Sequence, residues 1–265
     1  MKILIIGGGH SGRRFCEGLL LFSKNEIFLC SASETGKTIA LAQEYNLKFI
    51  LIDDLQKYVN NFDIIIIAVP IGNKHNIFEM LIKNYGYRKS VILEKPLSLE
   101  MDHIHKIHIL AKTANIKYIV AYNRRYMSID KFLNQDLLEI QFPIVDRENA
   151  LVHGLPHAID FTMLLLEDIY LIINRIDINC GNCVIYGCGQ KNKFILKIYI
   201  SNRKENMVRV NDNVINWPSL KVYNQMIKKL NTISMEEVDN NFKKEIIILT
   251  IMKEVIGYYE TKKLY

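Results

Sequence analysis

The sequence predicts an α/β protein in which a doubly wound parallel sheet precedes a smaller α+β domain with a mostly antiparallel open sheet. Over residues 1–122, short β-rich segments alternate with segments of helical periodicity, which is typical of consecutive βαβ units. Over residues 171–216, strand-like segments follow one another with only turn residues between them. We therefore expect two domains, residues 1–122 and 123–265.

The N-terminal elements follow from local patterns. Segment 64–69 is continuously apolar, as in a strand that is buried on both faces of a parallel sheet. Phe15, Leu19 and Phe22 recur at helical spacing and form one apolar stripe. The expected strands are residues 2–6, 27–31, 49–52, 64–69, 91–93 and 118–121. The expected helices are residues 11–22, 35–45, 73–84 and 99–113.

The C-terminal half has a different pattern. Turn residues at 179–182 and 190–193 indicate hairpins, and therefore an antiparallel sheet. Segment 142–156 is expected to be irregular. The expected strands are residues 172–179, 183–186, 194–200 and 207–210, and the expected helices are residues 127–135, 158–166 and 243–259.

Composition excludes several classes of protein. A chain of 265 residues with 49% hydrophobic residues can build a core without disulfides or metal. The net charge of +6 comes from scattered lysines and arginines, so it does not indicate nucleic-acid binding. The chain has no apolar segment long enough for a membrane span or a signal peptide, and its five cysteines do not suggest a disulfide framework. We expect a cytoplasmic protein.

A glycine loop lies between the first expected strand and helix. Gly7, Gly9 and Gly12 form a G-x-G-x-x-G pattern. In this context Gly7 permits a tight turn, Gly9 lets the backbone approach a pyrophosphate, and Gly12 lets the helix pack on the strand. The helix N-terminus, with His10 and Ser11, offers N–H groups and a positive dipole end to the phosphates. The loop predicts a dinucleotide-binding Rossmann domain.

The end of the second strand bears on the choice of dinucleotide. An acidic residue about 20 positions past the loop would bind the ribose 2′-OH of NAD, but no Asp stands there. Ser31, Ser33 and Lys37 could instead bind a 2′-phosphate, and Arg13 adds a nearby positive charge. Glu34 could serve NAD if the turn is shifted by a residue. The pattern favours NADP and leaves NAD open.

Glu94, Lys95 and Pro96 directly follow the fifth expected strand. The carboxyl ends of parallel strands face the crevice where ligands bind. A partly desolvated lysine beside a nicotinamide can give or take the proton of a substrate hydroxyl. Taken alone, such a lysine could equally be a surface charge. Pro96 fixes the turn and could follow a cis peptide bond.

Four motifs together indicate a family. They are Gly-x-Gly-x-x-Gly-Arg-Arg at 7–14, Ala68-Val69-Pro70 with His75, Glu94-Lys95-Pro96-Leu97-Ser98, and Ala121-Tyr122-Asn123-Arg124-Arg125-Tyr126. In order and spacing, residues 2–126 resemble the glucose–fructose oxidoreductase/inositol dehydrogenase (Gfo/Idh/MocA) family, of which this chain would be a short member. His157-Ala158-Ile159-Asp160 resembles the family's His-x-x-Asp and extends the resemblance to about residue 166.

The resemblance implies an NAD(P)-dependent oxidoreductase. Hydride would pass between the nicotinamide and a carbon–oxygen centre of a sugar, sugar nucleotide or cyclitol, and surface polysaccharide biosynthesis is a further hypothesis. Lys95 would relay a proton or orient the substrate, and His157 would assist it or act as general acid/base. The implied cofactor contacts include Val69, Pro70, His75, Glu94 and Lys95, and the implied substrate contacts are Lys95, Asn123, Arg124, His157 and Asp160.

One departure concerns the mechanism. His153 stands where the family commonly has Asp, four residues before the catalytic His. A histidine is not a constitutive anion, but it could carry protons itself, so His153 is a third catalytic candidate. Two other functions stay open: a non-catalytic dinucleotide-binding sensor or subunit, and a reductase of C=N or conjugated double bonds.

Remaining patterns suggest a partner but no metal. Apolar residues on both parities of 194–200 suggest a covered sheet face, so we expect a homo-oligomer formed through the second-domain sheet. His153 and His157 lack a third ligand nearby, and Pro156 interrupts their helical spacing. The group Cys180, Cys183 and Cys188 lacks a fourth ligand. His103, His105 and His108 are expected at the surface of an amphipathic helix.

Overall fold

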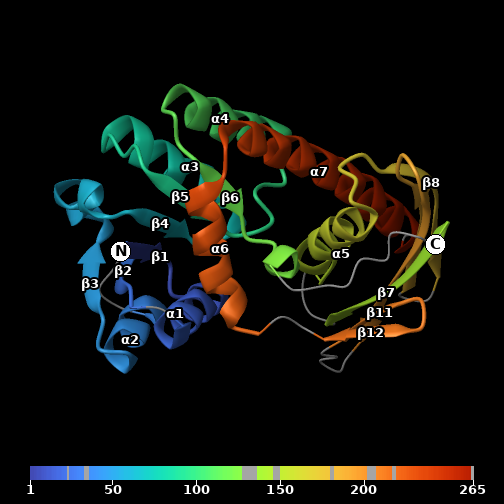
Figure 1. The fold of residues 1–265 in the computed structure, drawn as a ribbon, viewed down its shortest axis with the longest axis horizontal. Helices are drawn as coiled ribbons and strands as arrows, with labels where there is room; N and C mark the ends of the chain where they lie inside the picture. Colours follow the sequence, from blue (N-terminus) through green and yellow to red (C-terminus); the bar gives the residue numbers. More distant parts are fainter. Residues whose placement is uncertain are drawn as a thin grey trace. The chain divides into compact units, whose positions relative to one another are not determined.

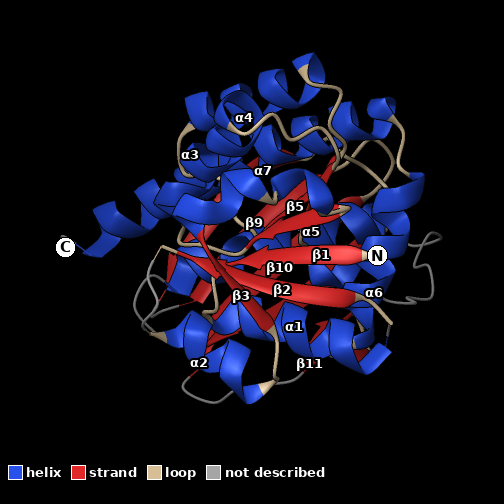
Figure 2. Ribbon diagram, turned by 90° about the vertical axis from the view of Figure 1, so that its left-hand side faces the viewer, coloured by secondary structure: helices blue, strands red, loops and turns tan. Residues whose placement is uncertain are grey.

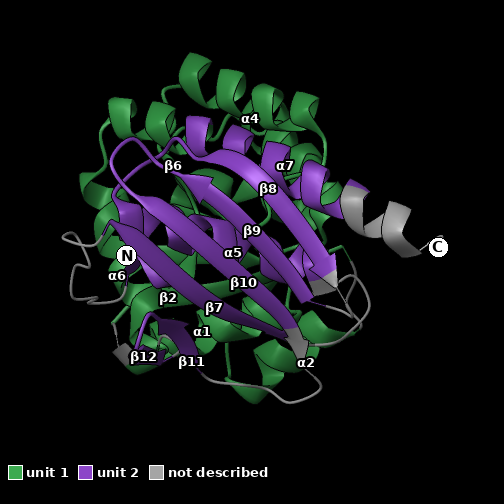
Figure 3. Ribbon diagram, turned by 90° about the vertical axis from the view of Figure 1, so that its right-hand side faces the viewer, with its two compact units in different colours: residues 1–123, 219–242 green, residues 124–218, 243–265 purple. Residues whose placement is uncertain are grey.

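The computed structural model describes residues 1–22, 24–32, 36–126, 136–145, 150–179, 182–201, 207–216 and 219–263. The chain forms two compact units (Figures 1 and 3). Unit 1 contains residues 1–123 and 219–242, and unit 2 contains residues 124–218 and 243–265. The division differs from the expected two domains in one respect, because residues 219–242 return to unit 1.

The sheet of unit 1 has six parallel strands in the order β3-β2-β1-β4-β5-β6. The strands are β1 (Lys2–Ile6), β2 (Glu26–Ser31), β3 (Lys48–Leu51), β4 (Ile64–Ile67), β5 (Ser90–Leu93) and β6 (Tyr118–Val120). The four isoleucines of β4 are at most 1% exposed, which confirms the strand predicted to be buried on both faces. The strand order reverses between β1 and β4, where a ligand crevice is expected at the carboxyl ends.

Helices cover both faces of this sheet. Figure 2 shows α1 and α2 on one side of the strands and α3 and α4 on the other. The helices are α1 (His10–Phe22), α2 (Lys37–Glu44), α3 (Lys74–Glu79) and α4 (Met101–Thr113). One π-helical turn, Met80–Asn84, follows α3 within the helix expected at 73–84. The predicted doubly wound architecture is confirmed.

Two later helices contribute to unit 1. The sequence analysis did not predict α6 (Lys221–Thr232), which packs on α1. Gly18 of α1 makes this packing possible, because a Cβ there would lie 2.6 Å from the Leu220 carbonyl oxygen. The rings of Phe15 and Tyr223 then meet edge to face, with centroids 4.6 Å apart. The long helix α7 (Met235–Lys263) begins in unit 1 and ends in unit 2.

The sheet of unit 2 is mixed and mostly antiparallel, in the order β12-β11-β7-β10-β9-β8, with one parallel pair, β7 and β10. The elements are β7 (Leu137–Val145), α5 (Ala150–Leu166), β8 (Ile172–Asn179), β9 (Asn182–Cys188), β10 (Lys193–Ser201), β11 (Met207–Val210) and β12 (Asn213–Asn216). Figure 3 shows α5 behind this sheet, and no described helix of unit 2 covers the face toward the viewer. The predicted fold class is confirmed.

The prediction that residues 142–156 are irregular is wrong, because they contain the end of β7 and the start of α5. Proline explains the error at both places. Pro143 lies beyond the part of β7 that pairs with β11, where a missing N–H costs little. α5 continues through Pro156 because packing outweighs the lost helical hydrogen bond. The helix expected at 127–135 lies outside the described residues.

Turns and helix lengths complete the description. The expected turn at 190–193 is present, and the Gly189 N–H donates to the Asn192 carbonyl at 2.9 Å. The turn expected at 179–182 includes residues outside the described part. In the ranges that the structure describes, no helix combines the length and apolar composition that a membrane crossing requires.

All three histidines of α4 were expected at the surface, but only His105 is exposed, and His103 and His108 are half-buried. The ring of His108 stacks on Phe242 of α7 with centroids 4.0 Å apart. The His108 Nε2 atom lies 3.4 Å from an Asp239 carboxylate oxygen, which also binds Lys112. Burial lowers the pKa of His108, and Asp239 acts in the opposite direction.

His108 should make stability depend on pH. Its pKa is lower in the folded chain than the ordinary value of about 6.5, so the unfolded chain binds the proton more readily. We expect the free energy of unfolding to fall as pH drops from 7 to 5, measured by urea unfolding at each pH. His108→Phe should keep the stack and reduce this slope, whereas His105→Asn should retain it. Equal slopes for wild type and His108→Phe would contradict the assignment.

Candidate functional site

The glycine loop brings backbone atoms unusually close together. Gly7 has a φ of +101°, and a Cβ there would lie 2.6 Å from the Ala68 carbonyl oxygen. A Cβ on Gly12 would overlap with the carbonyl oxygen of Gly7. Both positions therefore require glycine: Gly7 for the turn and its contact with the end of β4, and Gly12 for the start of α1 on β1.

Gly8 has a steric role that sequence reasoning missed. A Cβ there would overlap with the backbone of Thr38 in α2. The Gly8 N–H donates to the buried Thr38 hydroxyl oxygen at 2.8 Å, which holds the start of α2 against the loop. The available signal was the run of three consecutive glycines, since the G-x-G-x-x-G pattern leaves the residue at position 8 open.

Gly9 differs from its neighbours because it faces open space. No atom lies within 4 Å of the place where its Cβ would be. His10 and Ser11 form the first turn of α1, which contains no acidic residue to offset the positive end of the helix dipole. Space at Gly9 and positive potential at the helix end fit a dinucleotide diphosphate, so these residues could hold the predicted cofactor.

The residues expected near the ribose are only partly described. Ser31 ends β2 and is half-buried, and Lys37 is the exposed first residue of α2. Ser33 and Glu34 lie outside the described residues. No feature in the described part of this turn distinguishes NAD from NADP by itself.

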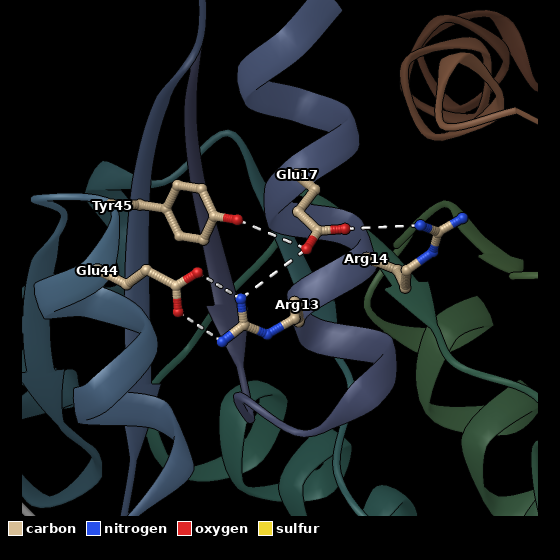
Figure 4. A network of polar contacts seen from close by, with 5 residues as sticks. All are labelled: Arg13, Arg14, Glu17, Glu44 and Tyr45. Carbon is tan, nitrogen blue, oxygen red and sulfur yellow. Dashed lines mark hydrogen bonds and ion pairs between the residues drawn. The ribbon is translucent and has the colours of Figure 1, made fainter.

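Arg13 does not support the expected contribution to a 2′-phosphate site. Figure 4 shows its guanidinium directed at Glu44 of α2, with two hydrogen bonds of 2.6 Å, and toward Glu17. Glu17 also receives the Tyr45 hydroxyl at 3.5 Å and lies 3.6 Å from the guanidinium of Arg14. The charge of Arg13 is thus already matched by carboxylates within unit 1, which the local sequence could not reveal.

Glu94 and Lys95 lie at the carboxyl end of β5, and both are half-buried. The Lys95–Pro96 peptide bond is cis. The Ser11 hydroxyl lies near enough to the Glu94 carboxylate to affect its pKa, so the glycine loop and this segment are neighbours. Burial raises the pKa of Glu94, while Lys95, Lys74 and Ser11 act in the opposite direction.

Lys74 is a further residue of this region that sequence reasoning missed. It is the first residue of α3, only 2% exposed, and its ammonium donates to the Pro96 carbonyl at 2.5 Å. A buried lysine has no distinctive sequence pattern, because lysines are usually at the surface.

The loop after β4 contains the other residues expected near the nicotinamide. Val69 is half-buried and Pro70 is exposed. The His75 ring stacks on His103 of α4 with centroids 3.5 Å apart. Burial lowers the pKa of His75, and the neighbouring His103 lowers it further. His75 therefore favours a neutral ring.

Asn123 is joined to a residue from the C-terminal half of the chain. Its Nδ2 donates to the Tyr223 hydroxyl at 3.1 Å, and its buried Oδ1 has no hydrogen-bond partner among the described residues. Burial raises the pKa of Tyr223, and the nearby Glu94 carboxylate adds to the rise. Tyr223 was missed because α6 was not predicted. Unit 1 thus brings Ser11, Glu94, Tyr223 and Asn123 into one polar cluster.

The expected catalytic histidines belong to unit 2. His153 and His157 are half-buried and one turn apart on α5, since the helix continues through Pro156. Between them, a Cβ on Gly154 would lie 2.5 Å from the side chain of Ile144, so glycine lets α5 lie close to β7. Lys95, in contrast, belongs to unit 1.

Arg124 and Asp160, which were expected at the border of the substrate, are 3% and 1% exposed. The Asp160 carboxylate accepts a hydrogen bond from Arg125 at 2.5 Å. The Arg124 guanidinium lies 4.4 Å from the centroid of the Phe142 ring, and burial lowers its pKa. The side chains of Arg124 and Asp160 therefore both lie in the interior of unit 2. Their partners, Phe142 and Arg125, are distant from them in the sequence, so a short motif does not reveal these contacts.

Histidine and cysteine side chains are the candidate metal ligands of this chain. In the described part of the chain, no three His, Cys, Asp or Glu side chains are grouped so that they could hold a metal ion. Cys183 is buried, and burial raises its pKa to about 12, which leaves an unreactive thiol. Cys188 is half-buried, and Cys180 lies outside the described residues.

Fold and glycine loop together define a dinucleotide-binding α/β protein, and residues 1–122 match the family model GFO_IDH_MocA, described as oxidoreductase family, NAD-binding Rossmann fold. No curated protein matches the chain. The sequence of residues 1–122 is thus similar to the NAD-binding part of the Gfo/Idh/MocA oxidoreductase family. The predicted resemblance and the prediction of an NAD(P)-linked oxidoreductase are confirmed at this level.

Solved structures with the same fold extend over nearly the whole chain. A Gfo/Idh/MocA family oxidoreductase from Vibrio cholerae has a TM-score of 0.75 and 12% identity over 98% of this chain and 99% of its own. A UDP-N-acetylglucosamine 3-dehydrogenase from Acidithiobacillus ferrooxidans has a TM-score of 0.69 and 14% identity over 96% of this chain and 96% of its own. An oxidoreductase from Agrobacterium radiobacter, in complex with NAD⁺, L-tartaric acid and magnesium, has a TM-score of 0.71 and 11% identity over 97% of this chain and 96% of its own. At these identities the likeness shows the fold.

Two glycines of the loop should separate binding from folding. Gly9→Ala places its methyl in open space, so we expect unchanged stability and at least about tenfold weaker dinucleotide binding, measured by nicotinamide fluorescence. Gly12→Ala meets the Gly7 carbonyl and should lower the free energy of unfolding by about 2 kcal/mol or more. Equal dinucleotide affinity of Gly9→Ala and wild type would rule out a diphosphate site at this loop.

Proposed function

We propose that the chain is an NADP-dependent dehydrogenase or reductase that acts on a carbon–oxygen centre of a sugar, sugar nucleotide or cyclitol. The observation that carries the proposal is the position of Lys95. It is half-buried at the carboxyl end of β5, next to Glu94, whose carboxylate lies near the Ser11 hydroxyl of the glycine loop. A proton-transferring amine beside a dinucleotide loop is what hydride chemistry at an alcohol carbon requires.

Each polar residue then has a defined task. A bound nicotinamide would supply hydride transfer at the substrate carbon. Lys95 exchanges the proton of the substrate hydroxyl, and the neighbouring Glu94 carboxylate attracts its ammonium form. His157 acts as the partner acid or base, and His153, one turn earlier on α5, carries protons instead of holding a fixed negative charge. His75, Val69 and Pro70 would border the nicotinamide.

Support for the substrate class comes from Asn123 and from the structural neighbours. The buried Oδ1 of Asn123 has no hydrogen-bond partner among the described residues, and a substrate hydroxyl would supply one. One solved structure with this fold is a UDP-N-acetylglucosamine 3-dehydrogenase, which acts on a sugar nucleotide. Asp160 is assigned to binding Arg125, and Arg124 to packing on Phe142, because Asp160 and Arg124 are both buried.

The proposal of NADP rests on the end of β2. Ser31 stands where an acidic residue would bind the 2′-OH of NAD, and Lys37 offers a positive charge at the start of α2. Arg13 is not part of this proposal, since Glu44 and Glu17 already pair with it.

We also propose self-association through the sheet of unit 2. Strand register places Glu139, Ile195, Tyr186 and Arg175 in one row across β7, β10, β9 and β8, on the face without a described helix. On the opposite face, Phe194, Leu196 and Ile198 are buried. A face with half-buried Ile195 and Tyr186 beside opposite charges fits a second copy of the same surface.

Lys95→Ala should bind the dinucleotide almost normally and lose turnover by at least about 100-fold, because proton transfer by a positioned group contributes this much. Turnover is measured as nicotinamide absorbance change on a panel of sugar nucleotides and cyclitols. Lys89→Ala is the control, since Lys89 is exposed just before β5. Unchanged turnover of Lys95→Ala would reject the assignment.

Ser31→Asp should change the preference from NADP toward NAD, because a carboxylate repels the 2′-phosphate and binds the 2′-OH. We expect the ratio of affinities to change about tenfold or more, measured by titration with each dinucleotide. Lys37→Ala should weaken NADP binding and leave NAD binding unchanged. If both variants keep the wild-type ratio, the proposal of NADP recognition by this turn is wrong.

Tyr186→Glu should convert the oligomer to a monomer, because it places a charge in the proposed interface. The mass of each variant in solution is measured by light scattering. Ile109→Glu serves as the control, since Ile109 is 61% exposed on α4 of unit 1 and should not affect assembly. A monomeric wild type would contradict this part of the proposal.

A further inference from the structure

Lys74 is a buried cation that has no role in the proposed function. Only 2% of it is exposed, at the first residue of α3. Burying an ammonium is costly unless it is paired or hydrogen-bonded. Its Nζ donates to the carbonyl oxygen of Pro96 at 2.5 Å, which joins the loop after β4 to the loop after β5. The contact therefore ends one residue from Lys95.

The Pro96 carbonyl belongs to a segment that is held at two points. Lys74 binds it by a short, charge-assisted hydrogen bond. Two residues later, the Ser98 hydroxyl oxygen accepts the Glu100 N–H at 2.9 Å and lies 3.4 Å from the Nδ1 of His103. The backbone that carries Lys95 is thus fixed from α3 and from the start of α4.

Charge links the same residues. The Glu94 carboxylate is close to two ammonium groups, those of Lys95 and Lys74. The Ser11 hydroxyl of α1 and the Tyr223 side chain of α6 also lie near Glu94. The charges of two lysines thus act on one carboxylate. A positive charge on Lys74 is expected to oppose the protonation of a second amine close to it.

We propose that Lys74 is a positioning residue for Lys95: by holding the Pro96 carbonyl with a buried positive charge, it sets both the place and the charge state of the Lys95 amine. The inference rests on the proposed role of Lys95 and adds a second lysine to it. Lys74 itself does not reach the substrate in this assignment, because its ammonium is bound to backbone.

Three substitutions separate the two parts of the proposal. Lys74→Met removes both the hydrogen bond and the charge, Lys74→Gln keeps a donor without the charge, and Lys74→Arg keeps both. Lys83→Met is the matched control, because Lys83 is exposed in the π-helical turn after α3 and forms an ion pair with Glu79. Urea unfolding of each full-length variant identifies any that does not fold. If Lys74→Met is one of these, the comparison of Gln with Arg carries the test.

The first readout does not depend on turnover. The intact, folded chain is treated with acetic anhydride at a series of pH values. It is then digested, and mass spectrometry of the peptides gives the rate at which the Lys95 amine is modified. We expect the midpoint for Lys95 to move to higher pH by about 0.5–1 unit in Lys74→Met and Lys74→Gln. Lys74→Arg and Lys83→Met should keep the wild-type midpoint. An identical midpoint in all variants would overturn the inference.

The second readout uses any substrate that the wild type turns over. Lys74→Met should lower kcat about tenfold or more with an unchanged KM for the dinucleotide, and it should move the acid limb of the pH profile upward. Lys74→Gln should retain more of kcat, because it can still hold Pro96. A wild-type kcat and pH profile in Lys74→Met would reject the inference.

The two proposals fail in different ways. A shifted Lys95 midpoint without turnover by the wild type on any sugar nucleotide or cyclitol supports the placement of Lys74 and rejects the proposed function. Turnover by the wild type with an unshifted midpoint supports the function and rejects the role of Lys74.

Discussion

A close approach of backbone to backbone at the glycine loop determines where the other parts of unit 1 lie. The Gly7 carbonyl occupies the space that a side chain on Gly12 would need, so α1 starts directly at the end of β1. The first turn of α1 then brings Ser11 to Glu94, and Gly18 further along it lets α6 pack there. The backbone contact between Gly7 and Gly12 therefore determines which side chains, such as those of Ser11 and Glu94, lie close together.

The parallel sheet could be predicted from the sequence because its signals are local. β4 is a run of isoleucines, and burial on both faces needs no more than that pattern. The start of α5 and the end of β7 could not be predicted, because Pro143 and Pro156 argue locally against a strand and a helix. Long-range packing overrides them, because β7 pairs with β10, whose residues lie 56 positions later in the chain.

The candidate site shows the same limit. G-x-G-x-x-G and Glu94-Lys95 are short motifs in an informative context, and the structure brings their residues together through Ser11. Lys74 and Arg13 could not be interpreted from sequence, since each depends on a distant partner. One binds a carbonyl 22 residues later, and the other binds Glu44, 31 residues later. A buried lysine and a neutralised arginine look like surface charges until the fold is known.

The return of residues 219–242 to unit 1 has a consequence for synthesis on the ribosome. At about 5–20 residues per second, the intervening residues 124–218 take roughly 5–20 s to emerge. During that interval the side of α1 with Phe15 waits for the Tyr223 ring that will cover it. The nascent N-terminal sheet therefore carries an uncovered apolar strip that a chaperone could shield, and its folding is completed only after most of unit 2 has been made.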